Sequence, residues 1–163
     1  NWQPKDNIRL RLKAVRSVGD SWLLWQQEDR FQTFSTHSWE PELSFAYFIS
    51  AKQQIQLSSQ WVGIRAKHLE DLQLVETGAP LALVSDTADE TQDFTISNLS
   101  LQLRYRWEIA PLSELFVVYT RNGDDAAALE DPQDNAFDAL LSNAFNNPVD
   151  EQLVIKLRYR LGT

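Results

Sequence analysis

The feature that most constrains how this chain can fold is a strict alternation of apolar and polar side chains. In residues 99–107, Leu, Tyr and Trp alternate with Ser, Gln and Arg. Residues 8–14 and 153–161 follow a similar pattern, in which Arg and Lys occupy the polar positions. A period of two is typical of a half-buried β-strand, because a helix would scatter the basic side chains around its axis. The alternation therefore predicts an all-β fold.

Six segments carry this signal or a strong enrichment in β-branched and aromatic residues. They are residues 8–14, 43–50, 54–65, 94–107, 115–121 and 153–161. We predict that they form an antiparallel meander of about six long strands, arranged as three hairpins.

The predicted connections alternate in length. Those at 51–53 and 108–113 are short, whereas those at 15–40, 67–93 and 122–151 are long. Short turns on one side and long loops on the other are typical of a transmembrane β-barrel. A strand of about ten residues, tilted by ~45°, also crosses ~23–25 Å, the height of the apolar band in an outer membrane. The pattern favours a segment of an outer-membrane-type β-barrel, but soluble antiparallel sheets show the same alternation.

Six strands are too few for a closed barrel, since the smallest single-chain outer-membrane barrels have about eight. We therefore expect that this chain does not close a barrel alone, and that it needs the missing strands, a second chain or a soluble refolding of the same pattern. If it does close, Trp22–Gln26 and Phe31–Ser35 are the candidates for two further strands.

The two faces of the strand at 94–107 follow directly from the alternation. Leu101, Leu103, Tyr105 and Trp107 should share one face, and Gln102, Arg104 and Arg106 the opposite one. In a membrane the first face would contact lipid. Aromatic side chains near strand ends are candidates for the girdles at the membrane surfaces. These are Trp61, Trp107, Tyr119 and Tyr159.

The segment 115–119 is apolar at consecutive positions, so it needs cover on both faces. A helix predicted at Asp134–Phe145 is one candidate for this cover, with apolar residues at helical spacing and Asp134 as the N-cap. The helix could equally lie on the outer loop rather than over the lumen.

Basic side chains recur at the polar positions of the predicted strands and are the candidate lumen-facing residues. They are Arg9, Arg11, Lys13, Arg104, Arg106, Lys156, Arg158 and Arg160. On a lumen face they could form a basic wall that favours anionic solutes. They could also be structural, hydrogen-bonded to neighbours across the strands.

Composition excludes several classes of function. The chain contains no cysteine, so it can form neither a disulfide nor a thiolate metal site. The segments 67–93 and 124–151 hold 15 of the 23 acidic residues, and the net charge is −8. This charge disfavours nucleic-acid binding. The chain also lacks methionine, which suggests a mature or excised piece of a longer protein.

The sequence contains few residues in patterns that are typical of catalysis. His37 and His68 are the two histidines, and the sequence contains no G-x-S-x-G motif and no phosphate-binding glycine loop. The run His68–Asp71 offers potential metal ligands, but an acidic, solvated loop is the simpler interpretation. We therefore predict no catalytic residues, no metal site and no cofactor, and we expect that the protein is not an enzyme.

The stretch "DFTISNLSLQLRYRWEIAPLSELFVVYTRNG", residues 93–123, resembles a known family. It is similar to the C-terminal barrel region of large bacterial envelope proteins whose N-terminal part is a carbohydrate-binding, family-nine-like β-sandwich. "NWQPKDNIRLRLKAVR", "DSWLLWQQEDRF", "QQIQLSSQWVGIRAK" and "DEQLVIKLRYRLGT" extend the resemblance along nearly the whole chain. The most specific part is "RYRWEIAPLSELFVVYTR".

This resemblance implies that residues 1–163 are a single barrel segment at the C-terminal end of a longer protein in a Gram-negative outer membrane. The partners it implies are the lipid bilayer, the remaining barrel strands and the outer-membrane insertion machinery. Its function would be envelope transport, export or a surface role. One departure is the ending Leu161-Gly162-Thr163, because outer-membrane strands often end in an aromatic residue. The insertion machinery could recognise Tyr159 instead, or recognition could differ in this protein.

The alternative is a soluble antiparallel β-domain that binds a ligand. A glycan stacked on Trp22, Trp25 or Trp39 is the example that the sequence suggests. The two hypotheses differ in whether the protein fractionates with outer membranes or stays in solution.

Overall fold

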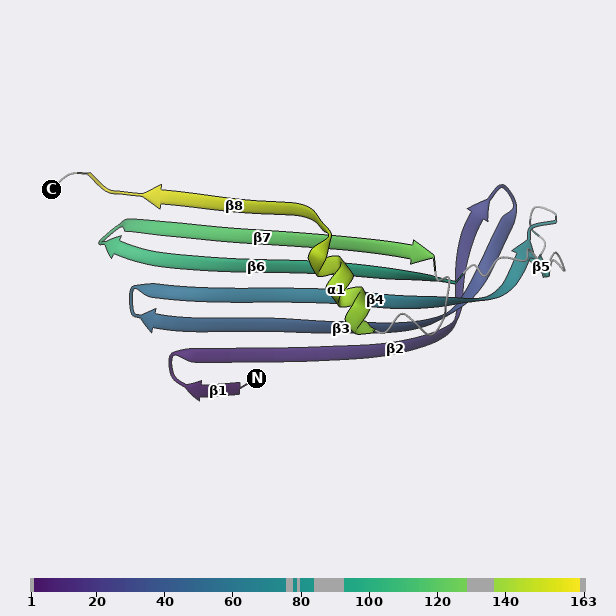
Figure 1. The fold of residues 1–163 in the computed structure, drawn as a ribbon, viewed down its shortest axis with the longest axis horizontal. Helices are drawn as coiled ribbons and strands as arrows, with labels where there is room; N and C mark the ends of the chain where they lie inside the picture. Colours follow the sequence, from purple (N-terminus) through teal and green to yellow (C-terminus); the bar gives the residue numbers. More distant parts are fainter. Residues whose placement is uncertain (1, 76–77, 79, 84–92, 129–136, 162–163) are drawn as a thin grey trace.

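The computed structural model describes residues 2–75, 78, 80–83, 93–128 and 137–161. Within these residues the chain forms one antiparallel β-sheet and one helix (Figure 1). The elements are β1 (Trp2–Lys5), β2 (Ile8–Gln27), β3 (Arg30–Ser50), β4 (Gln53–Gln73), β5 (Ala82–Leu83), β6 (Phe94–Ala110), β7 (Ser113–Ala128), α1 (Phe137–Asn146) and β8 (Pro148–Arg158).

The strands lie in the order β1-β2-β3-β4-β6-β7-β8, and the short β5 pairs with β4. Each strand is antiparallel to its neighbours, so the predicted antiparallel meander is confirmed. The described sheet is open, with β1 and β8 at its two edges. Sequential hairpins explain this order, because strands that follow each other in sequence can pair through short turns.

The prediction of a long loop at 15–40 is wrong. β2 continues to Gln27 and β3 begins at Arg30, so these residues form the outer half of a long hairpin. Trp22–Gln26 and Phe31–Ser35 therefore lengthen two strands and do not add new ones. Irregular register between Gly19 and Trp22 hid this continuity, since a bulge breaks the two-residue period.

The other long connections are shorter than predicted. β4 extends to Gln73, so the start of the predicted loop at 67–93 is strand. β7 extends to Ala128 and β8 begins at Pro148, which shortens the predicted 122–151 loop from both ends. Polar and acidic residues along these extensions suggested loops, yet backbone pairing with β3 and β6 is sufficient to continue both strands.

Three of the four two-residue turns lie at one end of the sheet, whereas the fourth, Glu28-Asp29 between β2 and β3, lies at the opposite end (Figure 1). The first three contain Asp6-Asn7 between β1 and β2, Ala51-Lys52 between β3 and β4, and Pro111-Leu112 between β6 and β7. Turns therefore occur within the predicted segments 51–53 and 108–113, but each is shortened to two residues. The β2–β3 hairpin, β5 and α1 belong to the connections toward the opposite end, where the hairpin bends away from the other strands (Figure 1). We call these two ends the short-turn end and the long-loop end.

α1 packs across one face of the sheet, over β4, β6 and β7 (Figure 1). Leu140 and Ala144 are buried there against Trp61 and Leu99. Ser97 joins the two layers, because its hydroxyl accepts a hydrogen bond from Trp61 Nε1 at 2.8 Å and donates one to the carbonyl of Leu140 at 2.8 Å. The predicted helix is confirmed over most of its length, but its proposed N-cap, Asp134, lies outside the described residues.

The prediction that this helix covers the apolar segment 115–119 is wrong. α1 lies over Leu99 and Gly123, beyond the apolar segment 115–119, and does not cover that segment. The close approach depends on Gly123, where an added Cβ would stand 1.7 Å from the carbonyl oxygen of Ala144. Glycine is therefore required at this position for contact between the helix and the strand.

Aromatic residues form a second small cluster at the long-loop end, on the opposite face. Phe34 is buried, and its ring centroid lies 5.1 Å from that of Phe94 and 5.7 Å from that of His68. Trp22 also contacts Phe94, at 6.0 Å between ring centroids. Since Trp22 is on β2 and Phe94 on β6, the hairpin must curve over this face. Among the described residues, no helix is long and apolar enough to cross a membrane.

Replacing Gly123 with valine should displace α1. The β-branched side chain suits a strand, so the expected effect comes from the clash with Ala144 and not from strand propensity. Overpacking of about 1–3 kcal/mol corresponds to roughly 5- to 150-fold faster amide exchange in 137–146. Hydrogen–deuterium exchange with mass spectrometry measures this rate.

The matched control is Gly19→Ala, whose added Cβ would meet only the Thr36 hydroxyl, at 3.0 Å. Exchange in 137–146 should be unchanged in that variant. Equal protection of α1 in Gly123→Val and wild type would contradict the docking described here.

Candidate functional site

Strand register assigns the side chains of the sheet to two faces of opposite character. Directly paired residues share a face, and successive residues alternate between faces. On one face, every second residue along part of six strands is Leu, Ile, Val, Phe, Tyr or Trp. We call this set of side chains the apolar belt. It comprises Ile8, Leu10, Leu12, Leu43, Phe45, Tyr47, Ile55, Leu57, Leu101, Leu103, Tyr105, Trp107, Leu115, Val117, Tyr119, Leu153, Ile155 and Leu157.

The apolar belt has no second layer among the described residues. α1, the element that packs on this face, lies beyond the long-loop margin of the belt. Leu12 and Leu157 are more than 60% exposed, and Leu103 in the middle of the sheet is 40% exposed. So large an uncovered apolar surface is unusual for a protein surface in water and marks a contact face.

The height of the apolar face is clearest on β6. Apolar side chains occupy alternate positions from Leu99 to Ile109. Leu99 is buried under α1, so the uncovered part of this stretch runs from Leu101 to Ile109. At ~3.3 Å per residue and a tilt of ~45°, it would rise ~19–21 Å.

Polar groups mark where the belt ends on the long-loop side. The Tyr119 hydroxyl donates a hydrogen bond to Glu151 Oε1 at 2.5 Å, and Arg121 Nη1 lies 3.6 Å from the same oxygen. The Arg121 guanidinium also donates to the carbonyl of Phe145 at the C-terminal end of α1, at 2.6 Å. A cation is stabilising at this position, because the C-terminal end of a helix carries the negative end of the helix dipole. We call Tyr119, Arg121 and Glu151 the rim network.

The opposite face carries most of the candidate basic residues, together with a few apolar side chains, Phe48, Phe116, Val118 and Val154. Register places Arg9, Arg11 and Lys13 of β2 on it, with Arg104 and Arg106 of β6. Lys156 and Arg158 of β8 share the same face. Arg160 follows β8, where its backbone N–H donates to the Ser113 hydroxyl at 3.0 Å. The predicted separation of Leu103 and Tyr105 from Arg104 and Arg106 is confirmed by register.

Several of these basic groups contact neighbours across strands. Lys13 Nζ lies 2.9 Å from Glu42 Oε1. Arg106 Nε donates to Glu114 Oε1 at 3.2 Å, and its terminal nitrogen contacts the same oxygen. The Arg9 guanidinium stacks over Phe48, 5.3 Å from the ring centroid. These contacts fit the structural interpretation of the basic set, although exposed ion pairs contribute at most about 1 kcal/mol each.

Two shallow hollows lie along strands β2, β3, β4 and β6. The larger, of about 280 Å³, is lined partly by Arg11, Lys13 and Glu42 together with serine hydroxyls. The second, of about 240 Å³, includes Gln56 and Arg104. Their hydroxyl, amide and guanidinium groups are suited to hydrogen-bonding a polar solute or water.

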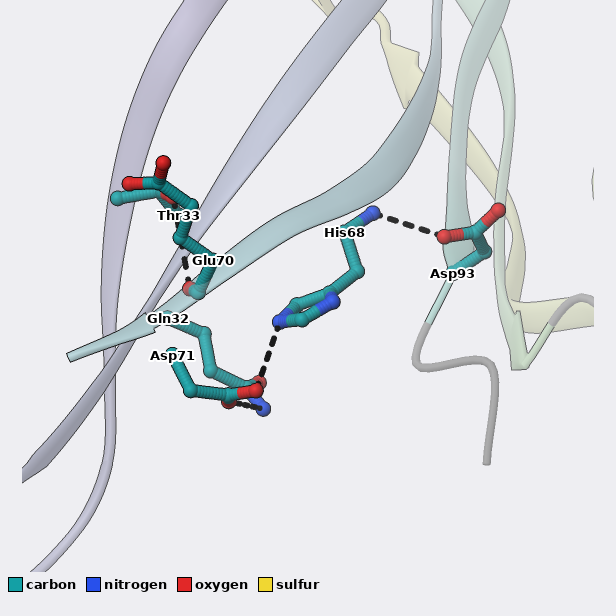
Figure 2. Close-up of polar contacts among 6 residues, drawn as sticks. All are labelled: Gln32, Thr33, His68, Glu70, Asp71 and Asp93. Carbon is teal, nitrogen blue, oxygen red and sulfur yellow. Dashed lines mark hydrogen bonds and ion pairs between the residues drawn. The ribbon is translucent and has the colours of Figure 1, made fainter. Parts of the chain in front are cut away.

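Figure 2 shows the polar contacts around His68. His68 lies on β4 and not in a loop, which corrects the prediction for residues 68–71. Its backbone N–H donates to Asp93 Oδ1 at 2.8 Å, and its Nε2 lies 3.4 Å from Asp71 Oδ2. The buried Gln32 donates from Nε2 to Asp71 Oδ1 at 2.8 Å. The cluster thus connects β3, β4 and the start of β6.

This arrangement joins strands and does not form a ligand set. In the described part of the chain, no group of three or more His, Asp or Glu side chains is placed to hold a metal ion. Asp93 is committed to a backbone N–H, and Asp71 to the amide of Gln32.

The three tryptophans suggested for glycan stacking, Trp22, Trp25 and Trp39, have different surroundings. Trp22 packs against Phe94, whereas Trp25 is 63% exposed and donates from Nε1 to the carbonyl of Glu28 at 3.1 Å. Trp39 lies near α1, 6.4 Å from Phe137 between ring centroids. Of the residues predicted to form membrane girdles, Trp61 is buried under α1, while Trp107 and Tyr159 are exposed.

Sequence reasoning missed several residues that position this surface. Ser97 and Gly123 hold α1, and Gln32 joins β3 to β4. Of these residues, Gly123 could have been identified from the sequence, because a glycine in the interior of a strand often marks close approach of another backbone. Ser97 and Gln32 carry no pattern that separates them from other polar strand residues.

Replacing Asp71 with alanine should loosen the outer part of the β2–β3 hairpin. The change leaves the buried Gln32 amide without this acceptor, at a cost of about 1–3 kcal/mol. Limited proteolysis should then cleave residues 20–34 several-fold faster than in wild type. The control is Glu70→Ala, a neighbouring exposed carboxylate, which should cleave at the wild-type rate. Equal rates for both variants would contradict a structural role for Asp71.

The comparisons with known proteins identify a family without a known activity. No curated protein and no solved structure matches the chain. A family model described as a domain of unknown function (DUF5916) matches residues 16–162. This match covers β3 to β8 completely and most of β2, including both faces of the sheet. The chain therefore belongs to the DUF5916 family.

Proposed function

We propose that this chain is part of the wall of an outer-membrane-type β-barrel, in a longer bacterial envelope protein with a transport, export or surface role. The observation that carries the proposal is the apolar belt, an uncovered face tall enough to span most of the apolar band of an outer membrane. The proposed location is the bacterial outer membrane. Its proposed partners are the bilayer, further barrel strands and the insertion machinery.

The energetic argument starts from the size of the apolar belt. Removing a large apolar side chain from water contributes ~1.5–3 kcal/mol. A soluble sheet gains this free energy by packing a second layer on its apolar face. Lipid chains supply the same environment without a second protein layer. Paired strands also suit a bilayer, because their backbone groups are hydrogen-bonded within the sheet.

The face with the basic residues would then line the lumen. Arginine facing water in a lumen costs little, whereas arginine facing lipid near the bilayer centre costs ~2–4 kcal/mol. This difference fixes the register, since a slip of one residue would turn Arg104 and Arg106 toward lipid. The rim network would lie at the membrane surface, where Tyr and Arg side chains are favoured.

The direction of the edge strands sets a condition on closure. β1 and β8 run the same way, because each strand between them reverses direction (Figure 1). Direct pairing of these edges would therefore be parallel, within one chain or between copies in the same membrane orientation. An all-antiparallel barrel needs an odd number of additional strands, which gives an even total, as is usual for bacterial barrels. We propose that these strands come from elsewhere in the full-length protein.

Leu103→Arg should impair barrel assembly in the full-length protein. Leu103 lies at the centre of the belt, between Leu57 and Tyr119, so an arginine there would face lipid. A penalty of ~2–4 kcal/mol corresponds to roughly 30- to 900-fold in an equilibrium constant. Heat-modifiable mobility on a gel measures the assembled fraction.

The matched control is Arg104→Gln, on the adjacent position of the opposite face. It should assemble like wild type and at most change ion preference. If Leu103→Arg assembled as well as Arg104→Gln, β6 would not face lipid, and a soluble sheet would be the better account.

The two ends of the sheet should lie on opposite sides of the membrane. The absence of cysteine from the chain makes single-cysteine labelling direct, once any cysteine elsewhere in the full-length protein is replaced. A membrane-impermeant maleimide should label Asp20→Cys on intact cells. Lys52→Cys, in a short turn, should be labelled only after the outer membrane is permeabilised. The reverse result would invert the proposed orientation, and labelling of both on intact cells would contradict it.

A further inference from the structure

The position of α1 on the sheet is informative beyond the barrel proposal, on which the following inference rests. The helix lies on the same face as the apolar belt, immediately beyond its margin on the long-loop side. It crosses β6 and β7 at Leu99 and Gly123. A helix on this face of a barrel wall would lie outside the barrel and not in the lumen.

Contacts at the two ends of α1 show which way its flanks point. Phe137, in the first turn, lies over Gly63, between the Trp61 ring at 6.2 Å and the Arg65 guanidinium at 6.0 Å, so it points toward the sheet. Phe145, in the last turn, lies 4.8 Å from the guanidinium of Arg121. Along β7, Arg121 lies two residues nearer the short-turn end than Gly123. Tyr119, a residue of the apolar belt, lies two residues nearer still. The flank that carries Phe145 therefore faces the belt.

Leu141 lies on the same flank. At 3.6 residues per turn, Leu141 and Phe145 are about 40° and 80° around the helix from Phe137. Both are exposed, at 39% and 47%, although the buried face of the helix is close by. Polar side chains, including Ser142 and Asn143, occupy the outward side.

We propose that α1 is an interfacial anchor, which lies on the membrane surface and inserts Leu141 and Phe145 at the boundary between headgroups and acyl chains. Two observations support this occupant. Leu141 and Phe145 are exposed on the flank that faces the apolar belt, and the Phe145 ring lies against Arg121 of the rim network. A short helix with an apolar flank and a polar outer side suits this boundary.

Depth-dependent fluorescence quenching tests the anchor. Single cysteines at Leu141, Phe145 and Asn143 are labelled with an environment-sensitive fluorophore in the full-length protein. The protein is reconstituted into phosphatidylcholine vesicles that contain lipid with a doxyl quencher at a shallow or a deep position on the acyl chain. Each replacement leaves Leu140 and Ala144 intact, so the docked face of α1 is kept.

Leu103→Cys serves as the reference for the belt. We expect labels at Leu141 and Phe145 to be quenched several-fold more by the shallow quencher than a label at Asn143, and the label at Leu103 to respond most to the deep quencher. Quenching at Leu103 without quenching at Leu141 or Phe145 would overturn the anchor but not the barrel. Absence of quenching at all four positions would overturn both.

Discussion

The structure depends on one constraint, which is that a single sheet carries a large apolar surface on one face and charged groups on the other. Backbone pairing fixes this division, because paired residues must share a face. A shift of one residue would exchange Leu103 with Arg104, together with every other residue on the strand. The strong contrast between faces therefore specifies register, and it also demands an apolar environment on one side.

The helix and the ends of the strands fit around this division. Gly123 lets α1 approach the sheet, and Ser97 joins the helix to Trp61. The rim network separates the apolar belt from the polar extension of the sheet beyond it. At the far end, the bend of the β2–β3 hairpin brings Trp22 onto Phe94 on the opposite face. Side chains are therefore more closely packed toward the long-loop end than in the apolar belt.

Much of the sheet could be predicted from the sequence, because the two-residue period is a local signal. The turns at 51–53 and 108–113 and the faces of residues 101–107 followed from it directly. The outer half of the β2–β3 hairpin did not, since the bulge near Gly19 breaks the period and hairpin pairing supplies the order. The basic residues of β2, β6 and β8 share one face of the sheet. Their partners Glu42 and Glu114 could not be predicted, because cross-strand contacts depend on register.

The central claim is that lipid covers the apolar belt, and the most direct test is the periodicity of exposure along β6. Spin labels are placed singly at consecutive positions from Leu101 to Trp107 in the membrane-reconstituted, full-length protein. Collision with oxygen should be frequent at odd-numbered positions, and collision with a water-soluble nickel chelate at even-numbered ones. Oxygen collisions that peak at odd-numbered positions, with nickel collisions that peak at even-numbered ones, would support lipid contact of the apolar belt. Frequent collision of the odd-numbered positions with the nickel chelate would contradict it.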